Sequence, residues 1–131
     1  MSDTQRASLL LAHGSSDPLW LEPFNHLLAQ IRAQLTDSGS RVEMAYMELA
    51  EPSMTGQIRA LAEQGIRHID VLPLFFAAGR HLRKDVPAMI EALQQELASE
   101  GHIVEINLHK PVGLEPEVAS AISQVVIRQV R

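Results

Sequence analysis

The sequence LLLAHGSS, residues 9–16, decides the fold. Its apolar run has no polar interruption, which is typical of a β-strand buried on both faces of a parallel sheet. The run ends at His13, which is followed by a glycine and two serines. A second segment of the same kind, VLPLFFAAGRH over residues 71–81, ends in His81. The chain therefore predicts two buried strands, each with a histidine just beyond its end.

The rest of the chain repeats this unit of a strand followed by a helix. We expect strands over residues 8–12, 42–47, 68–74 and 103–108, and helices from 18 onward, over 52–65, over 85–101 and from 116 onward. Four such units predict an α/β fold, with a parallel sheet, right-handed crossovers and helices on both faces. The length of 131 residues suits one domain over residues 1–131.

The composition of the strands predicts their order. The first and third strands are almost continuously apolar, whereas residues 42–46 and 104–108 alternate between apolar and polar side chains. Alternation is typical of half-exposed edge strands, so the order 2-1-3-4 is expected, in a flavodoxin-like three-layer arrangement. Pro73 has no amide N–H to donate, and we expect it at the end of its strand.

Apolar stripes predict which helical residues face the core. In the third and last helices the expected inward residues are Met89, Ile90, Leu93, Leu97, Val118, Ile122, Val125 and Val126. The methionines of the chain fit core packing better than metal ligation.

Composition excludes several classes of protein. A net charge of −5 weighs against nucleic acid as a partner, and the lack of cysteine excludes disulfides and thiolate metal sites. No run approaches the ~18 apolar residues that span a bilayer, and the first apolar stretch is too short for a signal peptide. We therefore expect a cytoplasmic protein that does not bind membranes. Against the acidic total, residues 67–84 carry four basic side chains and one acidic one.

The strand order predicts where a ligand binds. Ligands of open parallel sheets bind beyond the carboxyl ends of the strands, here between the first and third strands. His13 and His81 follow these two strands, and Glu48 follows the neighbouring second strand. Two imidazoles and a carboxylate suit Co²⁺, Ni²⁺, Fe²⁺ or Zn²⁺ and leave coordination positions open. Because imidazole binds metal when neutral, affinity should fall below about pH 6.

Residues around these three are suited to an anionic, flat ligand. The glycine and serines after the first strand offer N–H and hydroxyl groups, the basic residues add positive charge, and the segment FFAA offers an apolar surface. The predicted contacts are Gly14, Ser15, Ser16, Phe76, Ala78, Gly79, Arg80 and Arg83, with Lys84 beside them. Phe75 and Phe76 point to opposite sides if extended, so at least one belongs to the core. The set suits a planar polycarboxylate macrocycle.

At these residues the chain resembles the short-form sirohydrochlorin cobalt chelatases of cobalamin synthesis, members of the class II chelatases. The resemblance rests on HGSS (13–16), Glu48 in YME (46–48), PLFFAAGRH (73–81) and the turn KPVGL (110–114). It implies a chelatase fold, ATP-independent insertion of Co²⁺ into the anionic tetrapyrrole sirohydrochlorin, and no organic cofactor. It also implies that His13 and His81 ligate the metal with Glu48 beside them, and that the chain forms a homodimer.

Three other functions stay open at this stage. The same reaction could use Ni²⁺ or Fe²⁺, because the family includes such relatives. The chain could be a non-catalytic carrier of metal or tetrapyrrole, although it lacks a His-rich tail. It could also be an anion-binding regulatory module that needs no metal. Of the other histidines, His109 follows the last strand on the side of the site and is a candidate peripheral substrate contact, whereas His26, His68 and His102 are expected elsewhere.

Overall fold

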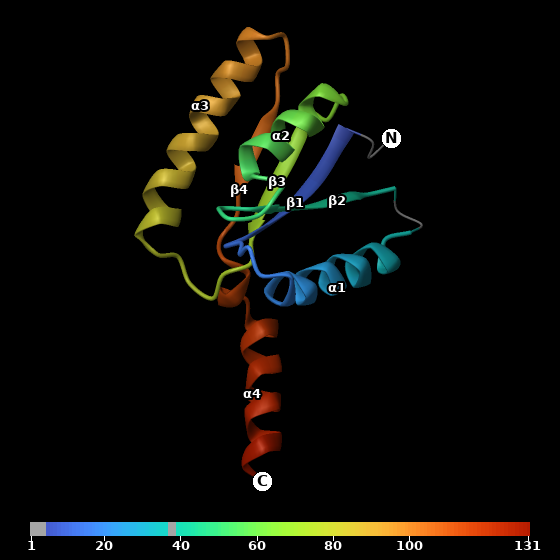
Figure 1. Cartoon of the computed structure of the whole chain (residues 1–131), viewed down its shortest axis with the longest axis vertical. Helices are drawn as coiled ribbons and strands as arrows, with labels where there is room; N and C mark the ends of the chain where they lie inside the picture. The colour runs from blue at the N-terminus through green and yellow to red at the C-terminus, as the bar shows by residue number, and fades with distance from the viewer. Residues whose placement is uncertain (1–4, 37–38) are drawn as a thin grey trace.

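A computed structural model describes residues 5–36 and 39–131, apart from the side chain of His81. These residues form a parallel sheet of four strands in the order β2-β1-β3-β4 (Figure 1). The strands are β1 (Arg6–Ala12), β2 (Arg41–Tyr46), β3 (His68–Pro73) and β4 (Glu105–Leu108). The predicted order and parallel pairing are confirmed, and Pro73 is the last residue of its strand.

Helices follow the strands, as the sequence predicts. They are α1 (Pro18–Gln34), α2 (Met54–Glu63), α3 (Val86–Ser99) and α4 (Pro116–Val130). A π-helix, η2 (His81–Asp85), leads directly into α3, and a 3₁₀-helix, η3 (Val112–Leu114), precedes α4. The start of α1 shows why the chain turns there, because the Asp17 carboxylate accepts the Leu19 N–H at 2.9 Å and Pro18 occupies the first helical position.

Helices cover both faces of the sheet, each with its own core. On one face, α1 packs through Trp20, Phe24, Leu28 and Ile31 against Leu10, Met44 and Tyr46 of the central and edge strands. On the other face, α2 and α3 bury Ile58, Leu61, Ile90, Leu93 and Leu97 against Leu9, Leu11, Ile69 and Val71. This burial places the sheet between two layers of helices and leaves its carboxyl edge for loops.

One predicted core residue of α3 is at the surface. Ile90, Leu93 and Leu97 are buried as expected, but Met89 is 42% exposed. The buried face of α3 is completed by Val86, which lies one helical turn before Ile90. Met89 therefore falls at the edge of the stripe, where α3 approaches the start of α2.

The apolar stripe of α4 is not buried, which corrects the expectation that it faces the core. Val118 is half-buried, while Ile122, Val125 and Val126 are exposed. Figure 1 shows α4 running away from the body. The part of the sheet that α1 leaves open is polar, because β3 and β4 present His68, Asp70, Glu105 and Asn107 there. Packing the apolar stripe on this surface would remove water from polar side chains without giving them new hydrogen bonds, so it would not stabilise the fold.

Within the described ranges, no helix is both long enough and apolar enough to cross a membrane.

Candidate functional site

The β1–β2 pairing continues past both strands and joins two predicted site residues. The Met47 N–H donates to the Ala12 carbonyl at 2.9 Å, and the Glu48 N–H donates to the His13 carbonyl at 3.0 Å. His13 and Glu48 are therefore on adjacent backbone positions at the carboxyl edge of the sheet. Both residues are exposed, so their side chains are open to solvent and ligands.

Gly14 is required by this close pairing. Its φ is +99°, and a Cβ atom there would lie 1.9 Å from the Glu48 carbonyl oxygen. No residue with a side chain fits at that distance, and the positive φ adds strain for any residue but glycine. Gly14 thus acts by allowing the chain after His13 to pass against the chain after Glu48.

The ring of His13 lies against the ring of Phe75. Their centroids are 4.2 Å apart with an interplanar angle of 27°. Pairing beyond the strands also sets this contact, because the Leu74 N–H donates to the Leu11 carbonyl at 2.7 Å. Phe75 is buried in the core, whereas Phe76 is 65% exposed, so the expected division between these two residues is confirmed. The buried phenyl ring gives the exposed imidazole a fixed support.

His81 begins η2 on the same edge, and its side chain lies outside the described residues. Its backbone is well anchored, because the next residue, Leu82, is buried and the Arg83 N–H donates to the Gly79 carbonyl at 3.0 Å. Among the side chains that are described, no three from His, Asp or Glu are grouped closely enough to hold a metal ion. That two imidazoles meet at one ion therefore stays a prediction.

The serines after Gly14 are partly used within the protein. The Ser15 hydroxyl accepts the Asp17 N–H at 3.0 Å, next to the Asp17 cap of α1. These contacts occupy two of the N–H groups that an anion could have used at this helix start. Ser16 is exposed. The Ser15 hydroxyl keeps its own hydrogen to donate, so the anion contacts predicted at Gly14, Ser15 and Ser16 stay predictions.

Among the described residues, the basic ones at the carboxyl edge lack the carboxylate partners that four other arginines of the body have. Arg80, Arg83 and Lys84 are exposed, and within the described part of the chain they form no ion pair. By contrast, Arg6, Arg32, Arg41 and Arg59 each contact a carboxylate. The site edge therefore keeps positive charge that the protein does not neutralise itself.

Lys110 belongs to this group and was missed as a site residue from the sequence. It follows β4, is exposed, and is likewise without an ion pair among the described side chains. Its position just after the last strand could have indicated it, because residues that follow the strands of a parallel sheet lie at the same edge. His109, the predicted peripheral contact, instead places Nε2 2.9 Å from Asp70 Oδ1, on the open face of the sheet.

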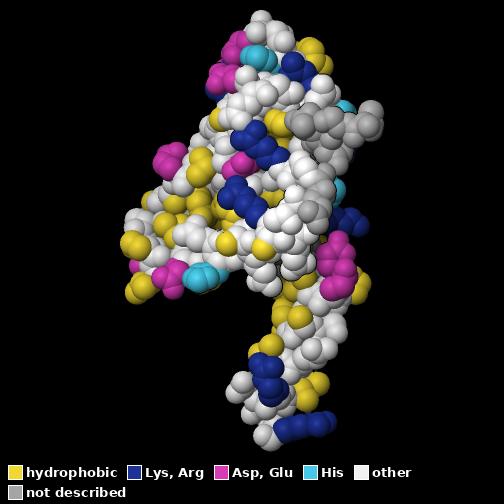
Figure 2. Space-filling view, turned by 90° about the vertical axis from the view of Figure 1, so that its right-hand side faces the viewer, with side chains coloured by type: hydrophobic (Ala, Val, Ile, Leu, Met, Phe, Trp, Pro, Cys, Tyr) yellow, Lys and Arg dark blue, Asp and Glu magenta, His cyan; other side chains and the backbone are white. Residues whose placement is uncertain are grey.

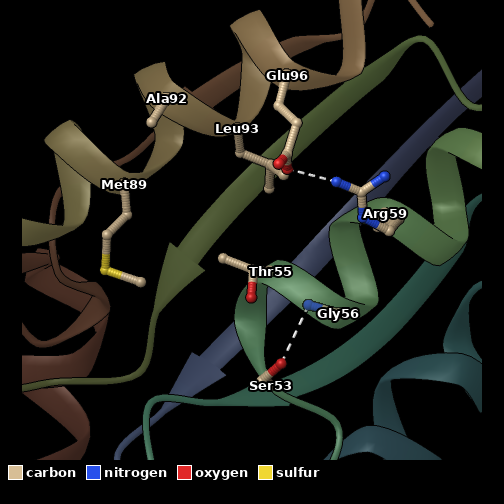
Figure 3. A pocket seen from close by; sticks show the side chains of 8 residues that line it. All are labelled: Ser53, Thr55, Gly56, Arg59, Met89, Ala92, Leu93 and Glu96. Atoms are coloured by element: carbon tan, nitrogen blue, oxygen red, sulfur yellow. Dashed lines mark hydrogen bonds and ion pairs between the residues drawn. The ribbon is translucent and has the colours of Figure 1, made fainter. Parts of the chain in front are cut away.

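A hollow connects the Glu48 side of the edge with the start of α3. A cavity of about 200 Å³ is lined by Tyr46, Met47, Ser53, Met54, Thr55, Val86 and Met89. Burial raises the pKa of the Tyr46 hydroxyl, so this phenol stays neutral. A more open groove of about 460 Å³ continues between α2 and α3 (Figure 3). At its far end Arg59 is neutralised by Glu96 and Glu100, which makes it a weak anion site.

Comparison with known proteins agrees with this geometry. A family model described as CbiX matches residues 7–129. The chain is 29% identical over 116 residues to the sirohydrochlorin cobaltochelatase of Sulfurisphaera tokodaii, covering 88% of this chain and 87% of that one. Its fold matches the crystal structure of a putative cobalamin biosynthesis CbiX protein from Marinobacter aquaeolei, with 43% identity, a TM-score of 0.77, and 95% and 97% of the two chains covered.

It also matches SirB from Bacillus subtilis with Fe³⁺, with 28% identity and a TM-score of 0.75. That match covers 92% of this chain and 45% of SirB, so this chain spans about half of SirB. Because the family model spans nearly all of its residues, the chain belongs to the CbiX family.

Proposed function

We propose that this chain is a sirohydrochlorin cobaltochelatase, which inserts Co²⁺ into sirohydrochlorin without ATP. The observation that carries the proposal is the carboxyl edge of the sheet, where an exposed His13 lies on Phe75 beside Glu48. Membership of the CbiX family, and the cobaltochelatase from S. tokodaii among its relatives, supply the reaction that this edge would perform.

The metal is a substrate that the site has to hold and then release. In the proposed site His13, His81 and Glu48 ligate Co²⁺, and the remaining coordination positions carry water or pyrrole nitrogen. A site with three protein ligands binds Co²⁺ less tightly than a site in which protein fills every position, and this favours transfer of the ion to the macrocycle. Phe75 keeps the His13 ring in one place while Co²⁺ leaves the imidazole.

Insertion exchanges one ion for two protons. As Co²⁺ enters, its bonds to the protein ligands break, two pyrrole N–H bonds break, the four ring nitrogens bind the ion, and two protons leave. Glu48 is the proposed first acceptor once its carboxylate has released the metal, because its backbone is tied next to His13 and its carboxylate is open to solvent. An imidazole that has lost its metal is the proposed second acceptor. Both protons then pass to water.

The basic residues suit the other substrate. Sirohydrochlorin is an anionic tetrapyrrole, and Arg80, Arg83, Lys84 and Lys110 offer it charges that have no ion-pair partner in the described part of the chain. The exposed ring of Phe76 offers an apolar face next to them. Gly79 and Ala78 keep the loop between these groups free of bulky side chains.

The second candidate differs in the metal alone. SirB from B. subtilis has been solved with Fe³⁺, so a relative of the same fold accepts iron. Imidazole and carboxylate ligands do not select Co²⁺, because their affinity rises in the general order Fe²⁺, Co²⁺, Ni²⁺. Cobalt is preferred here because the S. tokodaii relative is named for it.

The test is a metal-competition assay that follows the absorption of sirohydrochlorin without oxygen. The protein should accelerate insertion of Co²⁺ above the protein-free rate and faster than it does Ni²⁺ or Fe²⁺. His13→Ala and His81→Ala should each lower kcat/KM at least about 100-fold. His68→Ala is the matched control, because His68 lies at the opposite end of the sheet and pairs with Glu105.

Three results would overturn the proposal. A His13→Ala protein that inserts Co²⁺ at the normal rate would remove this site from the reaction. A wild-type protein that binds Co²⁺ or sirohydrochlorin without accelerating insertion would be a carrier. A protein whose thermal stability does not change with Co²⁺ would fit an anion-binding module, since a ligand of the native state raises stability.

We further propose that the working form is a homodimer, for which SirB offers support, because a chain of twice this length has room for two such units. The cytoplasm stays the expected location.

A further inference from the structure

One residue of the candidate site has a backbone conformation that its side chain disfavours. Leu49 directly follows Glu48, and its φ of +63° places it in the left-handed region. Among the described residues it is the one non-glycine residue with a positive φ. A Cβ atom crowds the backbone in this conformation, and bulky side chains tolerate it poorly, so glycine or asparagine is the usual occupant. A leucine at this position therefore needs a reason of its own.

The backbone around Leu49 explains its conformation but not its side chain. The Glu48 carbonyl oxygen lies against Gly14, since a Cβ atom on that glycine would be 1.9 Å from it. The Tyr46 N–H donates to the Pro52 carbonyl at 2.9 Å, which closes the short loop between these two residues. The two contacts fix the backbone before and after Leu49. Neither of them requires an apolar residue at this position.

The side chain of Leu49 does not serve the core either. It is 68% exposed, whereas Met47 and Ala50, which stand before and after the pair of Glu48 and Leu49, pack against the two cores. Glu48 is exposed as well. The loop therefore presents a carboxylate and an apolar side chain together, at the edge where the macrocycle is proposed to bind.

A second exposed apolar side chain lies on the other side of His13. Phe76, which is 65% exposed, follows β3 as Leu49 follows β2, and β1 with His13 lies between these strands. Gly113 holds the backbone there, because its N–H donates to the Phe75 carbonyl at 2.9 Å and a Cβ atom on it would lie 2.3 Å from the Phe76 Cα. Two strand spacings amount to roughly 10 Å, a distance that a tetrapyrrole ring spans.

Other exposed apolar residues lack this combination of position and strain. Those of α4 lie along the helix that projects from the body (Figure 2), and Ile103 precedes β4 at the amino end of the sheet. Leu19 and Leu114 are exposed toward the carboxyl edge too, but their backbones are not left-handed. The conformation therefore singles out Leu49.

We propose that Leu49 is a substrate-contact residue, whose side chain packs against the face of the sirohydrochlorin ring beside Glu48. The inference rests on the proposed function and deepens it, because it names how the site holds its macrocycle. Leu49 and Phe76 contact the ring on either side of the ion, and the cations at the edge meet its carboxylates. Covering an exposed leucine removes apolar surface from water and so favours binding. The left-handed backbone keeps this contact next to the proton acceptor.

The first test compares Leu49→Asn with the wild-type chain in binding metal-free sirohydrochlorin. Asparagine adopts the left-handed conformation readily but offers no apolar side chain. The dissociation constant, read from the fluorescence of the macrocycle, should rise about 10-fold, and KM should rise with it while kcat changes less than about 2-fold. Ile103→Asn is the matched control, because Ile103 is 70% exposed at the opposite end of the sheet. Equal affinities of Leu49→Asn and the wild type would overturn the proposal.

The second test separates contact with the macrocycle from support of the fold or of Glu48. Leu49→Asn should unfold at the wild-type temperature or slightly above it, because it relieves the backbone strain. Its affinity for Co²⁺ alone, measured by calorimetry, should stay within about 2-fold of the wild type, since leucine offers no ligand atom. Leu49→Met keeps an apolar side chain and should bind sirohydrochlorin within about 3-fold of the wild type. A lower melting temperature or a lower Co²⁺ affinity of Leu49→Asn would make Leu49 a structural residue and contradict the proposal.

These outcomes are distinct from failure of the proposed function. A wild-type chain that binds sirohydrochlorin through Leu49 without accelerating insertion would refute the function and keep the contact. An active chelatase whose affinity for sirohydrochlorin is unchanged by Leu49→Asn would refute the contact alone.

Discussion

The two ends of the sheet carry the same kinds of residue in opposite states. At the amino end, His68 contacts Glu105 at 2.9 Å, and Arg6 contacts Asp70 at 3.5 Å. At the carboxyl end, His13 lies on an aromatic ring, and in the described part of the chain neither it nor Arg80 takes part in an ion pair.

The difference separates charges that are paired within the protein from charges that remain available to a ligand. Exposed ion pairs such as those at the amino end contribute about 1 kcal/mol or less and leave little field outside the molecule. At the carboxyl end, the cations without an ion-pair partner and the exposed imidazole can interact with an approaching ligand. A site that has to receive both a cation and a polyanion needs groups of the second kind, and matched substitutions at the two ends can test this division.

The largest effect is expected at Gly14, and the comparison is Gly65, a glycine with positive φ at the opposite end of the sheet. Gly14→Ala should lower the free energy of unfolding by about 3 kcal/mol or more and abolish activity, because its Cβ would collide with the Glu48 carbonyl. Gly65→Ala, at φ +94° with nothing within 4 Å, should cost only the backbone strain of about 1–2 kcal/mol. Urea unfolding measures both. Equal losses would show that the close approach at Gly14 has no special role.

A smaller effect is expected from the cations. Replacing Arg80, Arg83 and Lys84 together by alanine should raise KM for sirohydrochlorin roughly 10-fold and weaken its dependence on salt, since exposed charges act over about 10 Å at moderate ionic strength. Arg59→Ala is the control, because Arg59 already contacts Glu96 and Glu100. Initial rates at several salt concentrations provide the measurement. A similar rise in KM for Arg59→Ala would erase the distinction between paired and unpaired cations.

The aromatic support of His13 should matter less again. Phe75→Leu keeps an apolar core residue but removes the stacked ring, so stability should fall by about 1 kcal/mol and kcat by several-fold. Phe76→Leu, on an exposed ring, should leave stability unchanged and act on KM. Thermal unfolding and steady-state kinetics separate the two. An unchanged kcat in Phe75→Leu would mean that the imidazole needs no ring beneath it.

The smallest effect is expected at the amino end. His68→Gln removes the contact with Glu105, which is an exposed pair, and should change the free energy of unfolding by less than about 1 kcal/mol with no effect on kcat or KM. Any clear loss of activity would contradict the assignment of this end as structural.

The sequence predicted the sheet and its order because burial leaves a direct trace in the strands. The apolar run of β1 and the alternation in β2 and β4 report how many faces are covered, whereas β3 places His68 and Asp70 on an open face and is buried only at alternate residues. Placing His13 beside Glu48 then needed only the rule that parallel strands end at one edge, and their backbone hydrogen bond bears it out.

Other features depend on tertiary contacts that leave no local trace. The stripe of α4 reads as a core face, yet the sheet surface that would receive it is polar, and only the register of β3 with β4 reveals this. The pairing of His109 with Asp70 likewise joins residues 39 apart. The hydrogen bond from the Asp17 N–H to the Ser15 hydroxyl likewise depends on how the turn after β1 folds.

The backbone contact between Gly113 and Phe75 couples the candidate site to contacts made by α4. It ties the outer helix to the ring beneath His13 through one backbone hydrogen bond and a contact too tight for any side chain. Turnover per chain should then vary with protein concentration, falling on dilution as the copies of the proposed homodimer separate.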